Sequence, residues 1–345
     1  MNYIWSLKEL KKTPKNGLKV FSCFSCGGGS SMGYKLAGYD VLGNVEIDKA
    51  MMEIYQENNK PKYPYLMDIR DFNKIPDNEL PPELFDLDIL DGSPPCSTFS
   101  IAGKREKKWG NENHFREGQV KQRLDTLFLD FIDTAAKLKP KIVIAENVRG
   151  LIYGNAKGYV TEILSAFRNA GYYPKIYSFN SATMGVPQTR ERIFFIARRQ
   201  DLEYPDLKFH FDEKPIRYSE IKSKTPGPAL QVGSKKYNLW KCRRNGDLSL
   251  ADISIRLYNK ISHFNSRLLI DSRVVNTIAS TSAGRPIRFD SPRYISDDEI
   301  IKSQTFPQDY NFGNNDVQYV CGMSVPPIMM ARIASEIYEQ WLKTD

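Results

Sequence analysis

Up to about residue 200, short apolar runs alternate with stretches whose apolar residues recur at helical spacing. Such runs are typical of buried strands, and such stretches are typical of helices that pack on a sheet. Because the two kinds of segment alternate, the pattern predicts an α/β fold with a doubly wound, mostly parallel sheet. The expected strands are 18–24, 41–46, 67–69, 87–91, 142–145, 173–179 and 193–197, and the expected helices are 32–38, 48–58, 124–138 and 159–167.

The pattern changes beyond residue 200. Between residues 213 and 245, nine lysines and arginines outnumber two glutamates, aromatic residues are interleaved, and prolines and glycines interrupt any periodicity. This composition favours a small irregular module that binds a polyanion, although a solvated surface loop has the same composition. Periodic order returns after residue 272, with capping-box spacing at 296–299 and a final amphipathic helix at 328–341.

These changes predict two domains. We expect one domain at 1–200, completed by 310–345, and a small irregular domain at 201–309. The length of 345 residues suits two domains, and 41% hydrophobic and 26% charged residues are ordinary for a globular protein.

Composition also limits the possible environments and partners. No apolar run has the length of a membrane span, and the N-terminus lacks the apolar core of a signal peptide. The five cysteines are scattered and odd in number, which argues against a disulfide framework and for a reducing, cytoplasmic setting. The formal net charge of +8 admits a polyanionic partner but does not establish one.

A glycine turn follows the first expected strand. The turn comprises Cys26, Gly27, Gly28 and Gly29 and precedes a helix, an arrangement that lets a cofactor approach the backbone closely. Glu46 ends the next strand about twenty residues later, where nucleotide-type cofactors have a ribose hydroxyl bound. The pair Cys23 and Cys26 has no second Cys or His pair nearby, so we expect no metal site.

A stiff turn precedes the best candidate nucleophile. Pro94 and Pro95 cannot continue the strand 87–91, and Cys96 follows them directly. The thiol is either a positioned nucleophile or an inert buried side chain; this stretch alone does not decide between them. The basic, glycine-containing stretch 103–123 comes next and is either a lid or a solvated loop.

In this order, the motifs resemble those of the DNA (cytosine-5)-methyltransferases, of the bacterial modification type. The resemblance runs from residue 18 to the C-terminus, except near 200–270, where that family keeps its variable target-recognition region. It implies that the domain at 1–200 with 310–345 binds the cofactor and carries catalysis, and that the domain at 201–309 recognises the DNA target. The motifs that carry it are the glycine turn after Phe24, Glu46, Asp68, Pro94-Pro95-Cys96, Glu146-Asn147-Val148, Gln188-Thr189-Arg190-Glu191-Arg192, Arg273 with Thr277, and Gly322-Met323-Ser324-Val325-Pro326-Pro327.

The resemblance implies S-adenosylmethionine as the methyl donor and S-adenosylhomocysteine as the product, with no metal. Phe24 would stack on the adenine, Glu46 would bind the ribose hydroxyls, and Asp68 would lie near the adenine amino group. The implied cofactor-binding residues are Phe24, Ser25, Cys26, Gly27, Gly28, Gly29, Glu46, Ile47, Asp68, Ile69, Pro94, Ser324 and Val325.

The resemblance also implies the chemistry. Cytosine C5 is a poor nucleophile until a thiolate adds to C6, and Cys96 would supply that thiolate. Glu146 would donate a proton or hydrogen bond at N3, while Arg192 would hold the cytosine carbonyl and help orient Glu146. Arg190 would meet a phosphate. The base must leave the duplex to be reached, and the stretch 103–123 would close over it.

Duplex DNA is the implied partner, with a cognate restriction endonuclease acting separately. We expect a monomer that is cytoplasmic, associated with the nucleoid through DNA, and not bound to a membrane. Two alternatives remain. A catalytically silent DNA-binding relative is disfavoured by the presence of both Cys96 and Glu146, and an RNA-modifying enzyme is disfavoured by the basic region after residue 200. The implied DNA-binding residues are Ser97, Lys104, Arg105, Asn147, Gln188, Lys235, Lys236, Arg243 and Arg244.

The chain departs from the family pattern in four respects. Cys26 stands where the family usually has the first glycine of its turn, and the acid often found just before that motif is absent. Ser97 follows the nucleophile where glutamine is frequent, and Met323 replaces a common asparagine.

Overall fold

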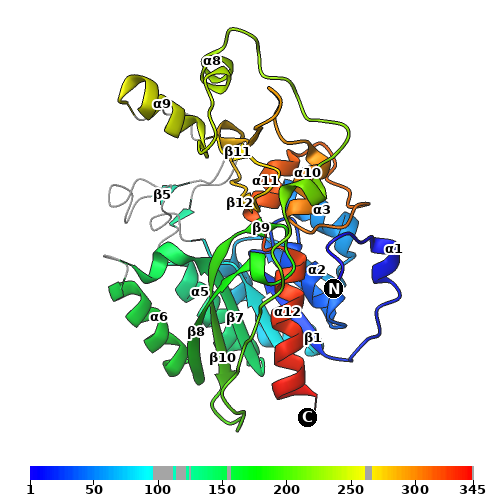
Figure 1. Cartoon of the computed structure of the whole chain (residues 1–345). Helices are drawn as coiled ribbons and strands as arrows, with labels where there is room; N and C mark the ends of the chain where they lie inside the picture. The colour runs from blue at the N-terminus through cyan, green and yellow to red at the C-terminus, as the bar shows by residue number, and fades with distance from the viewer. Residues whose placement is uncertain (96–111, 114–121, 124–125, 154–156, 261–265, 344–345) are drawn as a thin grey trace. The chain divides into compact units, whose positions relative to one another are not determined.

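The computed structural model describes residues 1–95, 112–113, 122–123, 126–153, 157–260 and 266–343 (Figure 1). The chain forms two compact units. The sheet unit comprises Lys12–Asn180, Glu191–His210 and Met330–Asp345, and the second unit comprises Met1–Lys11, Ser181–Arg190 and Phe211–Met329. The assignment of catalysis and target recognition to parts of the chain stays a prediction.

A seven-stranded sheet forms the centre of the sheet unit. Six strands run in one direction, and β10 is antiparallel to both of its neighbours. This confirms the predicted α/β fold with a mostly parallel sheet. In spatial order the strands are β3 (Tyr63–Leu66), β2 (Asp40–Glu46), β1 (Lys19–Cys23), β4 (Ile89–Gly92), β7 (Ile142–Val148), β10 (Glu191–Arg199) and β8 (Tyr172–Asn180).

Helices connect the strands of this unit. Two of them begin at aspartates whose side chains accept backbone N–H groups: Asp48 from Ala50, and Asp68 from Arg70. The strand end predicted at 67–69 is therefore wrong, because β3 ends at Leu66 and Asp68 already caps a helix. The helices are α2 (Gly29–Leu36), α3 (Lys49–Asn59), α4 (Ile69–Lys74), α5 (Leu127–Leu138) and α6 (Lys157–Asn169). Two short strands, β5 (Glu112–Asn113) and β6 (Gln122–Arg123), pair with each other.

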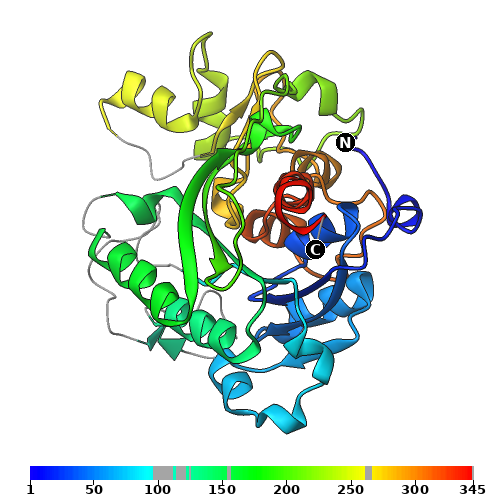
Figure 2. The ribbon, with the colours of Figure 1, turned by 90° about the horizontal axis from the view of Figure 1, so that it is seen from below.

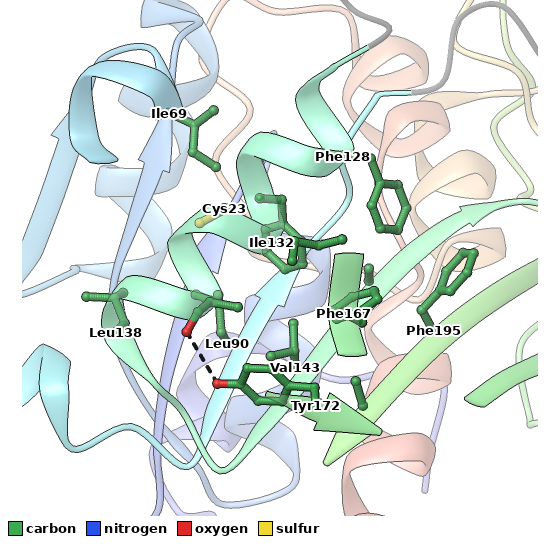
Figure 3. Close-up of a cluster of buried hydrophobic side chains, with 14 of the residues drawn as sticks. Cys23, Ile69, Leu90, Phe128, Ile132, Leu138, Val143, Phe167, Tyr172 and Phe195 are labelled. Atoms are coloured by element: carbon green, nitrogen blue, oxygen red, sulfur yellow. Dashed lines mark hydrogen bonds between the residues drawn. The ribbon is translucent and has the colours of Figure 1, made fainter. Parts of the chain in front are cut away.

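One large apolar cluster fills the space between the sheet and helices α4, α5 and α6 (Figure 3). Phe128 and Phe167 reach the sheet from two helices, and the rings of Phe128 and Phe195 pack edge to face with centroids 5.1 Å apart. Cys23 is buried in this cluster, and burial raises the pKa of its thiol. A thiol kept protonated inside an apolar cluster packs with its neighbours rather than reacts.

The last helix, α12 (Pro327–Ile337), starts in the second unit and ends in the sheet unit, where it continues as a π-helical turn at Tyr338–Leu342. Figure 2 shows its C-terminal part, in red, on the opposite side of β8 and β10 from α6. The Tyr39 hydroxyl donates to the Ala334 carbonyl at 3.0 Å and ties this part to the sheet unit.

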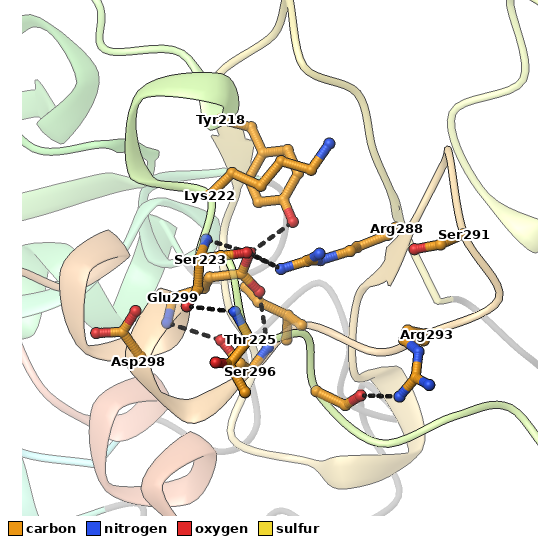
Figure 4. Close-up of polar contacts among 12 residues, drawn as sticks. Tyr218, Lys222, Ser223, Thr225, Arg288, Ser291, Arg293, Ser296, Asp298 and Glu299 are labelled. Carbon is orange, nitrogen blue, oxygen red and sulfur yellow. Dashed lines mark hydrogen bonds and ion pairs between the residues drawn. The ribbon is translucent and has the colours of Figure 1, made fainter.

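The second unit is built from short elements. Its sheets have two strands each, and the longest helix that lies wholly within its described residues, α9, has nine residues. A buried carboxylate, Glu299, links three of these elements by accepting from Tyr218, Arg288 and the Ser223 N–H (Figure 4). The elements are α1 (Leu7–Leu10), β9 (Gln188–Thr189), α7 (Tyr218–Ile221), α8 (Lys235–Lys241), α9 (Leu250–Tyr258), β11 (Leu268–Leu269), β12 (Val275–Asn276), β13 (Ile287–Arg288), α10 (Asp297–Ser303) and α11 (Val317–Met323).

Among the described residues, no helix combines the length and the apolar character that crossing a bilayer requires.

Candidate active site

The strand register brings several candidate residues to one edge of the sheet. Cys23, at the end of β1, pairs with Val45 of β2 and with Gly92 of β4, and Gly92 pairs with Ala145 of β7. Arg192 starts the antiparallel β10 opposite Val148, so it also lies at this edge. In the strand order, β2 follows β1 in one direction, whereas β7 follows β4 in the opposite direction. The edge between β1 and β4 is therefore the topological switch point, where open α/β sheets bind ligands.

The glycine turn opens its backbone toward Glu46. Phe24 and Cys26 adopt left-handed conformations, with φ of 53° and 46°, and Gly28 has φ of 81°. The Cys26 N–H donates to Glu46 Oε2 at 2.8 Å, and the Asp48 N–H donates to Oε1 at 2.9 Å. Burial raises the pKa of Glu46, and these backbone hydrogen bonds oppose that effect. The turn and the acid predicted to serve one cofactor therefore lie in direct contact.

Other predicted cofactor residues flank this turn. Phe24 is partly buried, with its ring centroid 6.5 Å from that of Phe131, and Ser25 accepts a hydrogen bond from Asn44 at 2.8 Å. The Asp68 side chain is 21% exposed beside Arg70, whereas Ile69 is buried in the apolar cluster. Ile69 thus offers a cofactor its backbone rather than its side chain.

The candidate acid and its arginine are paired. Arg192 Nε lies 2.8 Å from Glu146 Oε1, and the two side chains are only 14% and 12% exposed. Among the described residues, Oε1 receives no well-aligned hydrogen bond, so the contact is an ion pair by distance. A second nitrogen of Arg192, Nη1, donates to the Glu191 carbonyl at 2.8 Å. Oε1 therefore keeps hydrogen-bonding capacity for another group.

Asn147 is hydrogen-bonded to the segment that precedes Cys96. Its Nδ2 donates to the Pro94 carbonyl at 3.1 Å, and its Oδ1 accepts from the Val148 N–H at 2.9 Å. Asn147 is buried, and its predicted contact with DNA stays a prediction. Strand β4 ends at Gly92, as the prolines require. Cys96, Ser97, Lys104 and Arg105, and most of the predicted lid at 103–123, lie outside the described residues.

Four further candidates belong to the second unit. Arg190 is buried and donates from Nη2 to the Gly322 carbonyl at 3.1 Å. Gln188 is buried too, and it bonds through both ends of its amide to the Ser303 carbonyl and the Ile278 N–H. Because Gln188 is fully buried, its side chain could contact DNA only if the surrounding packing opened. Ser324 and Val325 are buried at the end of α11, where the Ser324 hydroxyl donates to the Val320 carbonyl at 2.8 Å.

The predicted DNA-binding lysines and arginines of this unit differ in their surroundings. Lys235 and Arg244 are exposed. Lys236 donates to the Ala283 carbonyl at 3.1 Å. The Arg243 guanidinium lies 3.5 Å from the centre of the Trp240 ring and donates to the Phe289 carbonyl, and burial lowers its pKa. Lys235 and Arg244 thus remain the more accessible of the four.

Asp91 received no role from the sequence pattern. It is 3% exposed and accepts hydrogen bonds from Ser22, Ser30 and Tyr34. An acid within the apolar run 87–91 was the available signal, because a carboxylate inside a strand needs partners.

Comparisons with known proteins identify the family. The C-5 cytosine-specific DNA methylase family profile matches residues 18–339, and the chain belongs to this family. It is a DNA (cytosine-5)-methyltransferase, and membership of the family implies S-adenosylmethionine as the donor and DNA as the substrate.

Three similar proteins illustrate the match. The type II methyltransferase M.NgoFVII of Neisseria gonorrhoeae is 27% identical over 350 residues, covering 93% of this chain and 87% of the relative. The type II methyltransferase M.FnuDI of Fusobacterium nucleatum is 30% identical over 203 residues, which is 58% of this chain and only about half, 53%, of that relative. The crystal structure of a Spodoptera frugiperda DNMT2 mutant has a TM-score of 0.64 at 16% identity, with 93% and 100% coverage, and supports the fold alone.

Proposed function

We propose that the protein methylates C5 of a flipped-out cytosine within a specific duplex DNA sequence, as the modification enzyme of a restriction-modification system. The type II methyltransferases among its relatives support this context. A cognate endonuclease would act separately on the same sequence. The basic module after residue 213 would contact the duplex, which favours DNA over an RNA substrate.

The residues at the sheet edge fit S-adenosylmethionine. The backbone is left-handed at Phe24 and Cys26, and the Cys26 N–H donates to Glu46, so the turn and the acid form one continuous polar surface. Glu46 would bind the ribose hydroxyls, Phe24 the adenine face, and Asp68 the adenine edge. When bound, the donor supplies a methyl group on a positively charged sulfur.

The proposed chemistry uses three residues. The Cys96 thiolate adds to cytosine C6, and this addition makes C5 nucleophilic. Glu146 donates a proton or hydrogen bond to N3 and so absorbs the charge that develops on the ring. Arg192 orients Glu146 and holds the cytosine carbonyl. After methyl transfer the C5 proton leaves to a base, and Cys96 is expelled.

The pairing of Glu146 with Arg192 carries this proposal. The pair lies at the same sheet edge as the Cys26–Glu46 contact and as the end of β4, and β4 leads into Pro94, Pro95 and Cys96. An acid that is held by an arginine, largely buried and without a well-aligned hydrogen bond at one oxygen among the described residues suits the binding of a flipped-out base.

Bisulfite sequencing tests the proposal. DNA from a host that expresses the wild-type chain should carry 5-methylcytosine at one recurring sequence, and a host that expresses Cys96→Ala should carry none. Methylation that persists in the Cys96→Ala host would exclude this residue as the nucleophile. Methylated RNA with unmodified DNA would instead favour the RNA substrate.

A further inference from the structure

Asp91 is a buried carboxylate that the proposed chemistry does not use. Its Oδ2 accepts from the hydroxyls of Ser30 at 2.7 Å and Ser22 at 2.9 Å, and its Oδ1 accepts from the Tyr34 hydroxyl at 3.2 Å. All four side chains are buried. Three hydroxyl donors converge on one carboxylate, which is the arrangement that keeps a buried acid ionised.

The position of this carboxylate is specific. Ser22 lies two residues before Phe24, and Ser30 follows Gly29 directly, so Asp91 is bonded to both ends of the glycine turn. The register places Asp91 between Ser22 of β1 and Ile144 of β7. It therefore lies in the strand between the proposed cofactor turn and the strand that carries Glu146.

Glu46 contacts the turn from β2, and the two elements that flank the turn supply no further acid. The strand that enters the turn, Lys19–Cys23, contains no acid, and neither does the first turn of α2. Helix α2 also starts at Gly28 without a side-chain cap. Asp91 thus brings a negative charge from the neighbouring strand to a helix start that favours anions.

Burial makes this charge costly. Desolvation raises the pKa of Asp91 to about 6, the three hydroxyls oppose the shift, and the charge of Glu146 adds to it. The other titratable groups that interact with Asp91 are Cys23, Tyr34 and Tyr55. A costly charge beside a proposed ligand site indicates a function rather than a contribution to stability.

We propose that Asp91 is a positioning residue whose negative charge makes the cofactor site prefer the positively charged methyl donor over its neutral product. S-adenosylmethionine carries a sulfonium, whereas S-adenosylhomocysteine is a neutral thioether of otherwise equal structure. In the proposed site the methyl group passes from a donor at the glycine turn to a base at Glu146, and β4 lies between the strands β1 and β7 that lead to these two groups. A charge there attracts the donor and lets the product leave.

The inference rests on the proposed cofactor site. Calorimetric titration with S-adenosylmethionine and with S-adenosylhomocysteine tests the role of Asp91 and the cofactor site separately. Asp91→Asn keeps the shape of the side chain and removes its charge: its carbonyl can accept from the two serines and its amide can donate to the Tyr34 oxygen, while the Tyr34 hydroxyl proton loses this acceptor. At pH 8 we expect the preference for donor over product to fall on the order of tenfold in Asp91→Asn.

The pH profile adds a readout that a merely structural role would not change. In the wild type the donor preference should fall below pH 6, as Asp91 takes up a proton, whereas Asp91→Asn should lack this step. Glu46 is ionisable in both proteins, so its protonation contributes equally to the two profiles and the difference between them reports Asp91. Should Asp91→Asn not fold, Tyr34→Phe removes one donor to the carboxylate and should move the midpoint of the profile to higher pH.

Asp88→Asn is the matched control. Asp88 is also buried and directly precedes β4, but it lies at the opposite edge, where it accepts from the Lys19 N–H at 2.7 Å and lies 3.3 Å from Lys141. The preference of the Asp88→Asn variant for donor over product should equal that of the wild type. An unchanged ratio in Asp91→Asn, or an equal loss in Asp88→Asn, would overturn the role of Asp91. A wild-type chain that binds neither ligand would overturn the proposed cofactor site as well.

Discussion

At the residue scale, Glu146 and Arg192 form the part of the site whose geometry the structure describes most fully. The 2.8 Å contact fixes the orientation of the carboxyl group, and its Oε1 lacks a well-aligned hydrogen bond within the described residues. Glu146→Gln keeps the size of the side chain but cannot donate the same proton. We expect single-turnover methyl transfer to slow by about 10²- to 10⁴-fold, with cofactor affinity unchanged.

Glu191→Gln is the control for this change. Glu191 precedes Arg192 in the same strand but pairs with Arg149 at 2.6 Å, with both side chains more than 40% exposed. Its loss should leave single-turnover rates near those of the wild type. A large loss of cofactor affinity in Glu146→Gln would move Glu146 from the base pocket into the cofactor site.

The raised pKa of Asp91 gives a prediction about stability. Because its pKa is about 6 in the folded protein, against an ordinary 3.8, the ionised group disfavours folding by on the order of 3 kcal/mol above pH 6. Most of this cost disappears as the pH falls from 6 toward 4, and it is absent below 3.8, where the group is protonated in both states. Asp91→Asn removes the charge, so its stability relative to the wild type should be greater at pH 8 than at pH 4. Urea unfolding at both values measures this difference, and a pH-independent difference would contradict it.

At the element scale, the sequence predicted the sheet well and its details less well. Apolar runs gave β1, β2, β4, β7, β8 and β10, because buried strands need such runs. The direction of β10 was not predictable, since a buried strand has the same pattern in either direction. Tyr63–Leu66 lacks an apolar run, so this strand was predicted a few residues too late, at 67–69. The two-residue strands of the second unit are too short to give any periodic signal.

The candidate site residues were predicted from the same apolar runs. Glu46 and Glu146 were found because each ends an apolar run, where parallel strands meet a ligand. Asp91 was missed because its role depends on Ser22, Ser30 and Tyr34, whose convergence is a property of the packed sheet and helix α2. Pairing across the sheet cannot be read from spacing along one strand.

The buried ion pair of the second unit supports a prediction at this scale. Arg288 lies 2.6 Å from Glu299, the two side chains are 7% and 0% exposed, and Tyr218 donates to the same carboxylate (Figure 4). Arg288→Ala would leave a buried carboxylate without its counter-charge. We expect a loss of about 3–5 kcal/mol in the stability of this unit, measured by chemical denaturation.

A surface pair provides the comparison. Lys343 and Glu339 lie 2.7 Å apart, with more than half of each side chain exposed. Lys343→Ala should leave the stability close to that of the wild type, because water and salt screen such pairs. Equal effects of the two substitutions would mean that the Glu299 network does not hold α7, β13 and α10 together.

At the scale of the whole molecule, the net charge of +8 bears on DNA binding only where the cations are free to meet phosphates. Arg244 is exposed in the basic module, whereas Arg243 already packs on Trp240 and donates to the Phe289 carbonyl. We therefore expect the two neighbouring arginines to act differently. Arg244→Ala should weaken DNA binding for any sequence and lower the slope of log affinity against log salt by about one.

Arg243→Ala should instead act mainly through the fold. Its loss removes a stacked cation and leaves the Phe289 carbonyl without that donor, so the variant should unfold at lower denaturant concentration. Its salt slope should stay near that of the wild type, as should that of Lys343→Ala, because neither substitution removes a phosphate contact. Fluorescence anisotropy across a salt series, together with denaturation of each variant, separates these effects. If Arg243→Ala alone lowered the salt slope, the guanidinium on Trp240 would be the group that meets the DNA backbone, and the stacking would orient it for that contact.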